Sequence, residues 1–173
     1  MNPTDSDSTF LAAGLLHFPD AYATVDAFRR LVAERVQAIL DSSRPDIWKP
    51  KEVKATRSES NGLWVGAGGP MALESVPGKF LILDVGIVWN RPQLKKPIMA
   101  GAYVVAAEDV LMQRLSDPSD AGVRLVRFGK NDLFVTALGG DALDVEGALR
   151  RVVEAAASAV AGAIAGRPNA ETG

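Results

Sequence analysis

The clearest hydrophobic pattern lies in residues 79–89, where aliphatic and aromatic residues dominate. Turn-forming residues bound this run, with Pro77 and Gly78 before it and 90–92 after it. β-Branched and aromatic residues between turn signals predict a central β-strand. Because side chains alternate along a strand, one face is predicted to carry Leu81, Leu83, Val85 and Ile87, and a second, partly wet face Ile82, Asp84, Gly86 and Val88.

Two segments repeat apolar residues at three- and four-residue steps, which predicts amphipathic helices. The first covers residues 19–41, and its apolar face is expected to consist of Val25, Phe28, Val32, Val36 and Ile39. The apolar residues of 10–18 are expected to form a lead-in that packs on the core. The second helix is expected over 144–165, with Asp144 as its cap and Gly166 at its stop.

Shorter apolar runs predict further strands, at 53–56, 63–65, 98–106, 123–128 and 133–138, and a short helix at 108–115. The glycine cluster 66–70 is interpreted as a flexible turn that ends the strand at 63–65. Mostly adjacent strands with tight turns favour an antiparallel sheet. The sequence therefore predicts a single α+β domain over 10–166. Its mainly antiparallel sheet of about five strands is flanked by an N-terminal and a long C-terminal helix, with disordered tails at 1–9 and 167–173.

Composition excludes several classes of protein. The 173 residues contain no cysteine and one histidine, so disulfide frameworks, thiolate nucleophiles and most zinc sites are not expected. The net charge of −2 makes a nucleic-acid partner unlikely on electrostatic grounds. No apolar run approaches the roughly 18–20 residues of a membrane span, and the acidic start lacks the basic region of a signal peptide. We expect a cytoplasmic protein without cofactor or metal, and the abundance of alanine, glycine and arginine hints at a bacterial source.

Asp84 is the one acidic residue inside the central strand, so it is the candidate for chemistry. Together with Gln93 and Lys95, or with Glu52 and Lys54, it could be fitted to the acidic pattern of metal-dependent nucleases. The first pair falls in a turn and the second precedes Asp84, so strand alternation is the simpler interpretation. The glycines at 66–70 and 139–140 lack the residues of a phosphate-binding loop. We therefore predict no catalytic residue, and the nuclease-like enzyme stays as the alternative.

The C-terminal helix is rich in alanine and glycine, so its surface is nearly smooth. Such a helix either lies flat on the chain's own sheet, the favoured reading, or forms a self-association surface. In the second case Ala159 and Ala163 are contact residues. Tryptophans dominate many interfaces, so Trp48, Trp64 and Trp89 are also candidate partner-binding residues, although core burial is favoured for each taken singly.

The order of elements resembles, in layout alone, small bacterial chaperones, toxin-neutralising immunity proteins and phage tail-assembly proteins. No motif accompanies this likeness, and a fold does not carry a function. The leading prediction is a non-enzymatic protein-interaction or assembly module of bacterial or phage origin that binds a protein partner or forms a homodimer.

Overall fold

The computed structural model of the chain describes residues 3–58, 63–89, 98–105, 115–118, 122–128, 131–138 and 144–166. Within them lie two helices and seven strands: α1 (Pro3–Ser42), β1 (Trp48–Pro50), β2 (Lys54–Ser58), β3 (Leu63–Leu73), β4 (Phe80–Trp89), β5 (Ile98–Val105), β6 (Arg124–Phe128), β7 (Asn131–Ala137) and α2 (Val145–Ala165). The predicted helix at 108–115 and the predicted tail at 167–173 fall outside the described residues, apart from Leu115.

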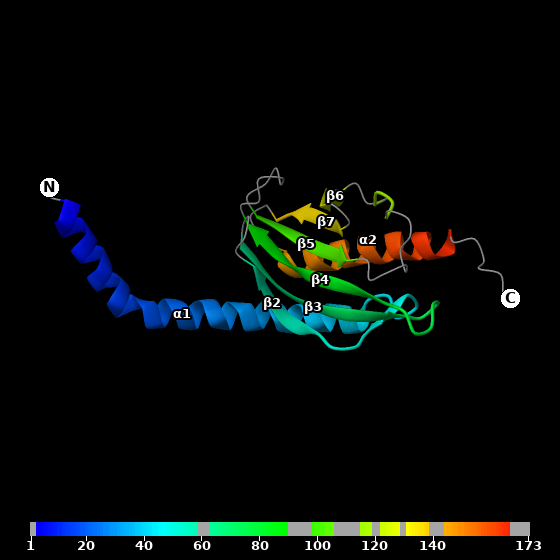
Figure 1. The fold of residues 1–173 in the computed structure, drawn as a ribbon, viewed down its shortest axis with the longest axis horizontal. Helices are drawn as coiled ribbons and strands as arrows, with labels where there is room; N and C mark the ends of the chain where they lie inside the picture. The colour runs from blue at the N-terminus through cyan, green and yellow to red at the C-terminus, as the bar shows by residue number, and fades with distance from the viewer. Residues whose placement is uncertain are drawn as a thin grey trace.

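The strands form one antiparallel sheet in the order β1-β3-β4-β5-β7-β6, and β2 also pairs with β3 (Figure 1). β3, β4 and β5 are consecutive neighbours, and β6 and β7, which correspond to the strands predicted at 123–128 and 133–138, pair with each other. The prediction of an α+β domain with an antiparallel sheet between an early and a late helix is confirmed. The sheet has seven strands where about five were expected, and the three-residue β1 is not among the predicted strands.

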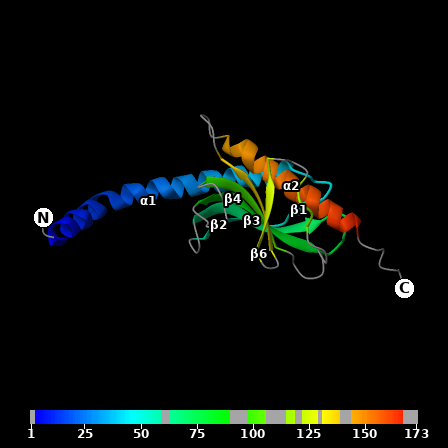
Figure 2. The same cartoon turned by 90° about the horizontal axis from the view of Figure 1, so that it is seen from above.

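Both helices cover the same face of the sheet (Figure 2). α1 packs mainly on β3 and neighbouring strands, α2 packs on β5 and β7, and the two helices touch each other. The predicted smooth C-terminal helix therefore lies on the chain's own sheet, the favoured of the two alternatives. Asp144 caps it as predicted, since its carboxylate accepts a hydrogen bond from the backbone N–H of Gly147 at 2.8 Å.

The predicted alternation along β4 is confirmed. Its helix-facing residues are almost fully buried in the main core: Leu81, Leu83, Val85 and Ile87. On the other face, Ile82 is 37% exposed and Asp84 is half-buried. That open face, which neither helix covers, holds a smaller apolar cluster of Trp64, Val88, Met99, Leu133 and Val135.

The glycine cluster at 66–70 lies inside β3, so its interpretation as a turn is wrong. β3 runs on to Leu73 and pairs with β4 along this stretch. A Cβ at Gly66 would strike the carbonyl oxygen of Val85, and one at Gly86 would strike that of Val65. These glycines are therefore required by the close approach of two strands, which is a recognised role of glycine within a sheet.

Helix α1 starts upstream of its predicted start. It begins at Pro3, includes Pro19 in its interior and ends at Ser42, one residue beyond its predicted end. At 1.5 Å per residue, 40 residues span about 60 Å, and the N-terminal half projects beyond the sheet (Figures 1 and 2). The expected lead-in that packs on the core is wrong, because Leu16 and Phe18 are 74% and 67% exposed on this projection.

Candidate interaction surface on helix α1

One stripe of residues runs along almost the whole of α1. Its members alternate at four- and three-residue steps through Phe18, Tyr22, Val25, Arg29, Val32, Val36 and Ile39, and in the sequence the same spacing reaches Leu15 and Leu11. This is the heptad spacing by which two helices pack side by side. We call the residues from Phe18 to Arg29 the seam.

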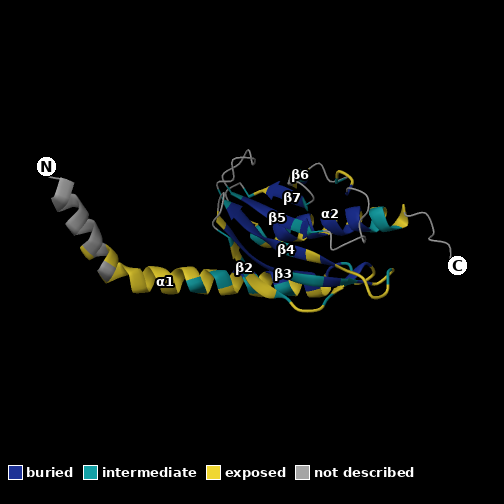
Figure 3. Cartoon of the chain, viewed as in Figure 1, coloured by how far each residue is buried: buried dark blue, intermediate teal, exposed yellow. Residues whose placement is uncertain are grey.

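The stripe changes environment halfway. Val32, Val36 and Ile39 are buried in the main core. Phe18 and Tyr22 are more than half exposed, and Val25 is 49% exposed, as the yellow projecting part of α1 in Figure 3 shows. The rings of Phe18 and Tyr22 lie 6.0 Å apart. Residues of the same periodic pattern are therefore buried in the core in the C-terminal half of α1 and exposed in its N-terminal half.

A groove follows the seam. It has a volume of about 340 Å³ and is lined by Phe18, Ala21, Tyr22, Val25, Asp26, Arg29 and Arg57. Six of the seven lining residues come from α1 at the heptad positions that face or flank a partner helix. Arg57 of β2 forms the opposite wall where α1 leaves the sheet. The α1 residues that line the groove thus follow heptad spacing.

Arg29 is the polar residue in the apolar stripe between Phe18 and Ile39. Its side chain is half-buried, and its Nε is buried without a hydrogen-bond partner. A buried donor without a partner costs free energy, about 1–3 kcal/mol. Arg29 stands where the covered and uncovered parts of the stripe meet.

Charge is distributed unevenly along α1. The first twenty residues contain Asp5, Asp7 and Asp20 and no lysine or arginine. Further along come Arg29, Arg30 and Arg35, of which Arg30 pairs with Asp26 at 2.6 Å. The same part of the helix also contains Asp26, Glu34 and Asp41, so α1 is acidic at its free end and close to neutral where it joins the sheet.

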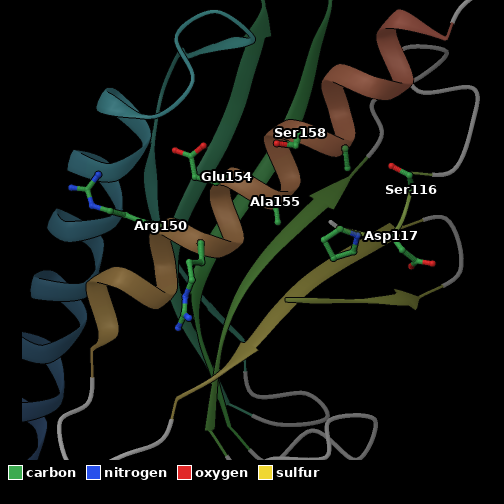
Figure 4. Close-up of a pocket in the computed structure, with 9 residues that line it drawn as sticks. Ser116, Asp117, Arg150, Glu154, Ala155 and Ser158 are labelled. Atoms are coloured by element: carbon green, nitrogen blue, oxygen red, sulfur yellow. The ribbon is translucent and has the colours of Figure 1, made fainter. Parts of the chain in front are cut away.

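A second groove, of about 520 Å³, lies beside α2 (Figure 4). Glu154 and Ser158 of α2 form one wall, and Ser116 and Asp117 form the other. Arg150, which also lines it, donates to the Glu146 carboxylate at 3.0 Å on its own helix. Charges of both signs line this groove, so it favours no single class of ligand.

The predicted partner residues do not gather on one surface. Trp48, Trp64 and Ala159 are at least 94% buried within the fold. Ala163 is half-buried against the core. Trp89 is half-buried at the end of β4, where its ring meets that of Phe28 at 6.1 Å and 63°. Their role in partner binding stays a prediction, and the seam is the surface that the fold leaves uncovered.

The nuclease alternative gains no metal site from the described residues. Within them, no group of three or more His, Asp or Glu side chains could hold a metal ion. Glu52 and Lys54 pair with each other at 3.0 Å on the surface. Gln93 and Lys95 lie outside the described residues. Asp84 lines a small pocket on the open face of the sheet, and the only carboxylate among the described lining residues is its own.

The sequence analysis missed the seam because it took Pro19 as the start of the helix. Proline is common in the first turn of a helix, but it is also tolerated inside a helix, where it produces a kink. The signal that could have found the seam was the unbroken spacing from Leu11 through Phe18 to Val25. It crosses the proline without a change of register.

Comparison with known proteins found no matching family model, no similar curated protein and no similar solved structure. Among the described helices, none is long and apolar enough to cross a membrane.

Proposed function

We propose that the protein is an assembly module that forms a homodimer by pairing the projecting halves of two α1 helices along the seam. The observation that carries this proposal is the continuous stripe of α1. Its N-terminal part is exposed, whereas its C-terminal part is buried in the core. Most helices in proteins owe their stability to the packing of an apolar face and not to helix propensity alone. A second helix on the seam supplies that packing.

The charges of α1 favour an antiparallel arrangement of the two helices. In a parallel pair, two-fold symmetry sets each residue opposite its own copy, so Arg29 would meet Arg29. In an antiparallel pair that crosses near residue 20, the acidic end of each helix passes Arg29 and Arg35 of the other copy. Opposite charges across an interface select the orientation that brings them together.

The exposed area is of the size that a modest dimer needs. An aromatic side chain presents about 150–250 Å², so Phe18 and Tyr22 together leave roughly 250 Å² uncovered at their observed exposure. A standard interface buries about 800 Å² on each partner. The two aromatic residues thus cover close to a third of that area, and Val25 with the helix flanks contributes to the rest.

Sedimentation velocity over a range of concentrations tests the proposal. The double variant Tyr22→Glu, Val25→Glu sets two charges in the seam and is expected to weaken dimerisation at least about a hundredfold, or about 3 kcal/mol. The matched control is Ala23→Glu, Ala27→Glu, which adds the same charges on the opposite, exposed side of α1. The control variant is expected to remain dimeric.

A wild-type protein that stays monomeric at high micromolar concentration would overturn the proposal. So would two double variants that weaken the dimer equally. The fluorescence of the buried Trp48 and Trp64, recorded for both variants, verifies that the sheet and its core remain folded.

Cysteine cross-linking tests the orientation, and the chain's lack of cysteine makes it site-specific. Ala21→Cys lies near the proposed crossing point, so two copies are expected to form a disulfide. Ala12→Cys lies about nine residues from it, so in an antiparallel pair its two copies are on the order of 25 Å apart. Disulfides through both Ala12→Cys and Ala21→Cys would show parallel pairing instead, because a parallel pair sets every residue opposite its own copy.

A further inference from the structure

The open face of the sheet carries a small pocket that the proposed dimer does not use. It has a volume of about 210 Å³ and is lined by Ser58, Trp64, Asp84, Tyr103 and Leu133. Three of these residues form one row across the sheet, because Asp84 is paired with Tyr103 and Tyr103 with Leu133. The same row continues to Gly68, which is paired with Asp84.

Glycine makes room for the carboxyl group in this row. A Cβ at Gly68 would strike Oδ1 of Asp84, so the carboxyl group lies over the glycine. Gly101 of β5 has a similar role, because a Cβ there would come within 3.2 Å of the Trp64 ring. The two glycines therefore let the Asp84 carboxyl group and the Trp64 ring lie close against the sheet, where both line the pocket beside Tyr103.

Both aromatic rings are held in place by hydrogen bonds. Trp64 Nε1 donates to Thr56 Oγ1 at 3.0 Å, and Asn131 Nδ2 donates to Tyr103 Oη at 2.7 Å. The side chain of Asp84, in contrast, has no hydrogen bond or ion pair in the part of the chain that the structure describes. A partly buried carboxylate without a partner is unusual, because no hydrogen bond or ion pair offsets the free energy that its desolvation costs.

Burial raises the pKa of the Asp84 carboxyl above its usual value. The native state then keeps this proton at pH values at which the unfolded chain has lost it, so stability falls as pH rises through this range. Above the raised pKa, the charged Asp84 lowers the free energy of unfolding. A cation in the pocket would reverse that cost, since an opposite charge favours the ionised carboxyl.

We propose that this pocket binds a small organic ammonium ion, with Asp84 as its counter-ion and Trp64 and Tyr103 as its aromatic walls. Ammonium groups are attracted both to carboxylates and to the faces of aromatic rings. The volume of about 210 Å³ is below the roughly 300–1,000 Å³ of sites for drug-sized ligands. The pocket therefore fits an amine of a few heavy atoms, free or at the end of a lysine side chain.

Titration with tert-butylammonium chloride, followed by calorimetry and by the NMR shift of the Trp64 indole N–H, tests the proposal at neutral pH. The uncharged analogue tert-butanol has nearly the same shape and is the ligand control. We expect saturable binding of the ammonium ion and none of the alcohol. N-acetyl-lysine methylamide, titrated in parallel, separates the two sources: if it also binds, the pocket accepts a lysine side chain, and if it does not, the site takes a free amine.

Asp84→Asn is the decisive variant. It is expected to lower the affinity for tert-butylammonium at least tenfold, while its free energy of unfolding at neutral pH rises, because the desolvated charge is gone. Asp117→Asn removes an exposed carboxylate elsewhere and is expected to bind as the wild type does. Equal binding of the ammonium ion and the alcohol, no binding of either amine, or unchanged affinity in Asp84→Asn would overturn the proposal. None of these results depends on whether the seam forms a dimer.

Discussion

The two halves of α1 share one pattern and have opposite surroundings. Val36 and Val25 both occupy the stripe, eleven residues apart, yet Val36 is fully buried and Val25 is 49% exposed. The buried half meets the sheet, whereas the projecting half extends beyond the sheet (Figure 3). The spacing of apolar residues therefore predicts that a helix face is to be covered, but not whether the same chain covers it.

The strongest test of this comparison uses the same substitution in each half. Val36→Asp buries an unpaired charge in the core and is expected to cost about 4 kcal/mol or more of the free energy of unfolding. Val25→Asp is expected to change the stability of the monomer by less than about 0.5 kcal/mol and to act on dimerisation instead. Urea unfolding at low and high protein concentration separates the two effects. Similar losses of monomer stability in both variants would show that the projecting half is covered by its own chain.

A smaller effect is expected where the two halves meet. Phe28 contacts the ring of Trp89 in an edge-on arrangement at 6.1 Å, so it attaches α1 to the end of β4. Phe28→Ala is expected to cost about 1–2 kcal/mol of monomer stability, through the lost ring pair and part of its buried area. Phe18→Ala is the matched control, because its ring contact is with Tyr22 on the same projecting helix. In thermal unfolding at low concentration, the control is expected to behave as the wild type does.

The class of the fold could be predicted because its signals are local. The run at 79–89 became β4, the hairpin formed at 124–137, and Asp144 caps α2 as its position before the last helix suggested. The alternation along β4 even assigned Leu83 and Asp84 to the correct faces.

What could not be predicted depended on pairing between distant strands. The glycines of β3 were interpreted as a turn, because glycine weakens an isolated strand and only the neighbouring backbone of β4 shows why it is needed. For the same reason the sequence indicated Asp84 as a candidate site residue but did not indicate the residues that lie beside it in the pocket. Trp64, Asp84 and Tyr103 come from three strands, and only the register of β3, β4 and β5 brings them to one pocket.

The smallest expected effect concerns Arg29, which lies at the boundary between the two halves of the stripe. Arg29→Leu removes a buried donor without a partner and makes the seam apolar throughout, so it is expected to raise monomer stability by about 1 kcal/mol. It also removes the charge repulsion that disfavours the parallel dimer, as polar residues in a helix seam commonly specify orientation at a cost in stability. In the Arg29→Leu background, Ala12→Cys is therefore expected to form a disulfide that it does not form otherwise.

Arg30→Leu is the matched control, since Arg30 is 76% exposed and pairs with Asp26 off the seam. The loss of that exposed pair costs at most about 0.5 kcal/mol and leaves the orientation unchanged. If both substitutions affect cross-linking equally, the orientation depends on the net charge of α1 and not on the residue in the seam.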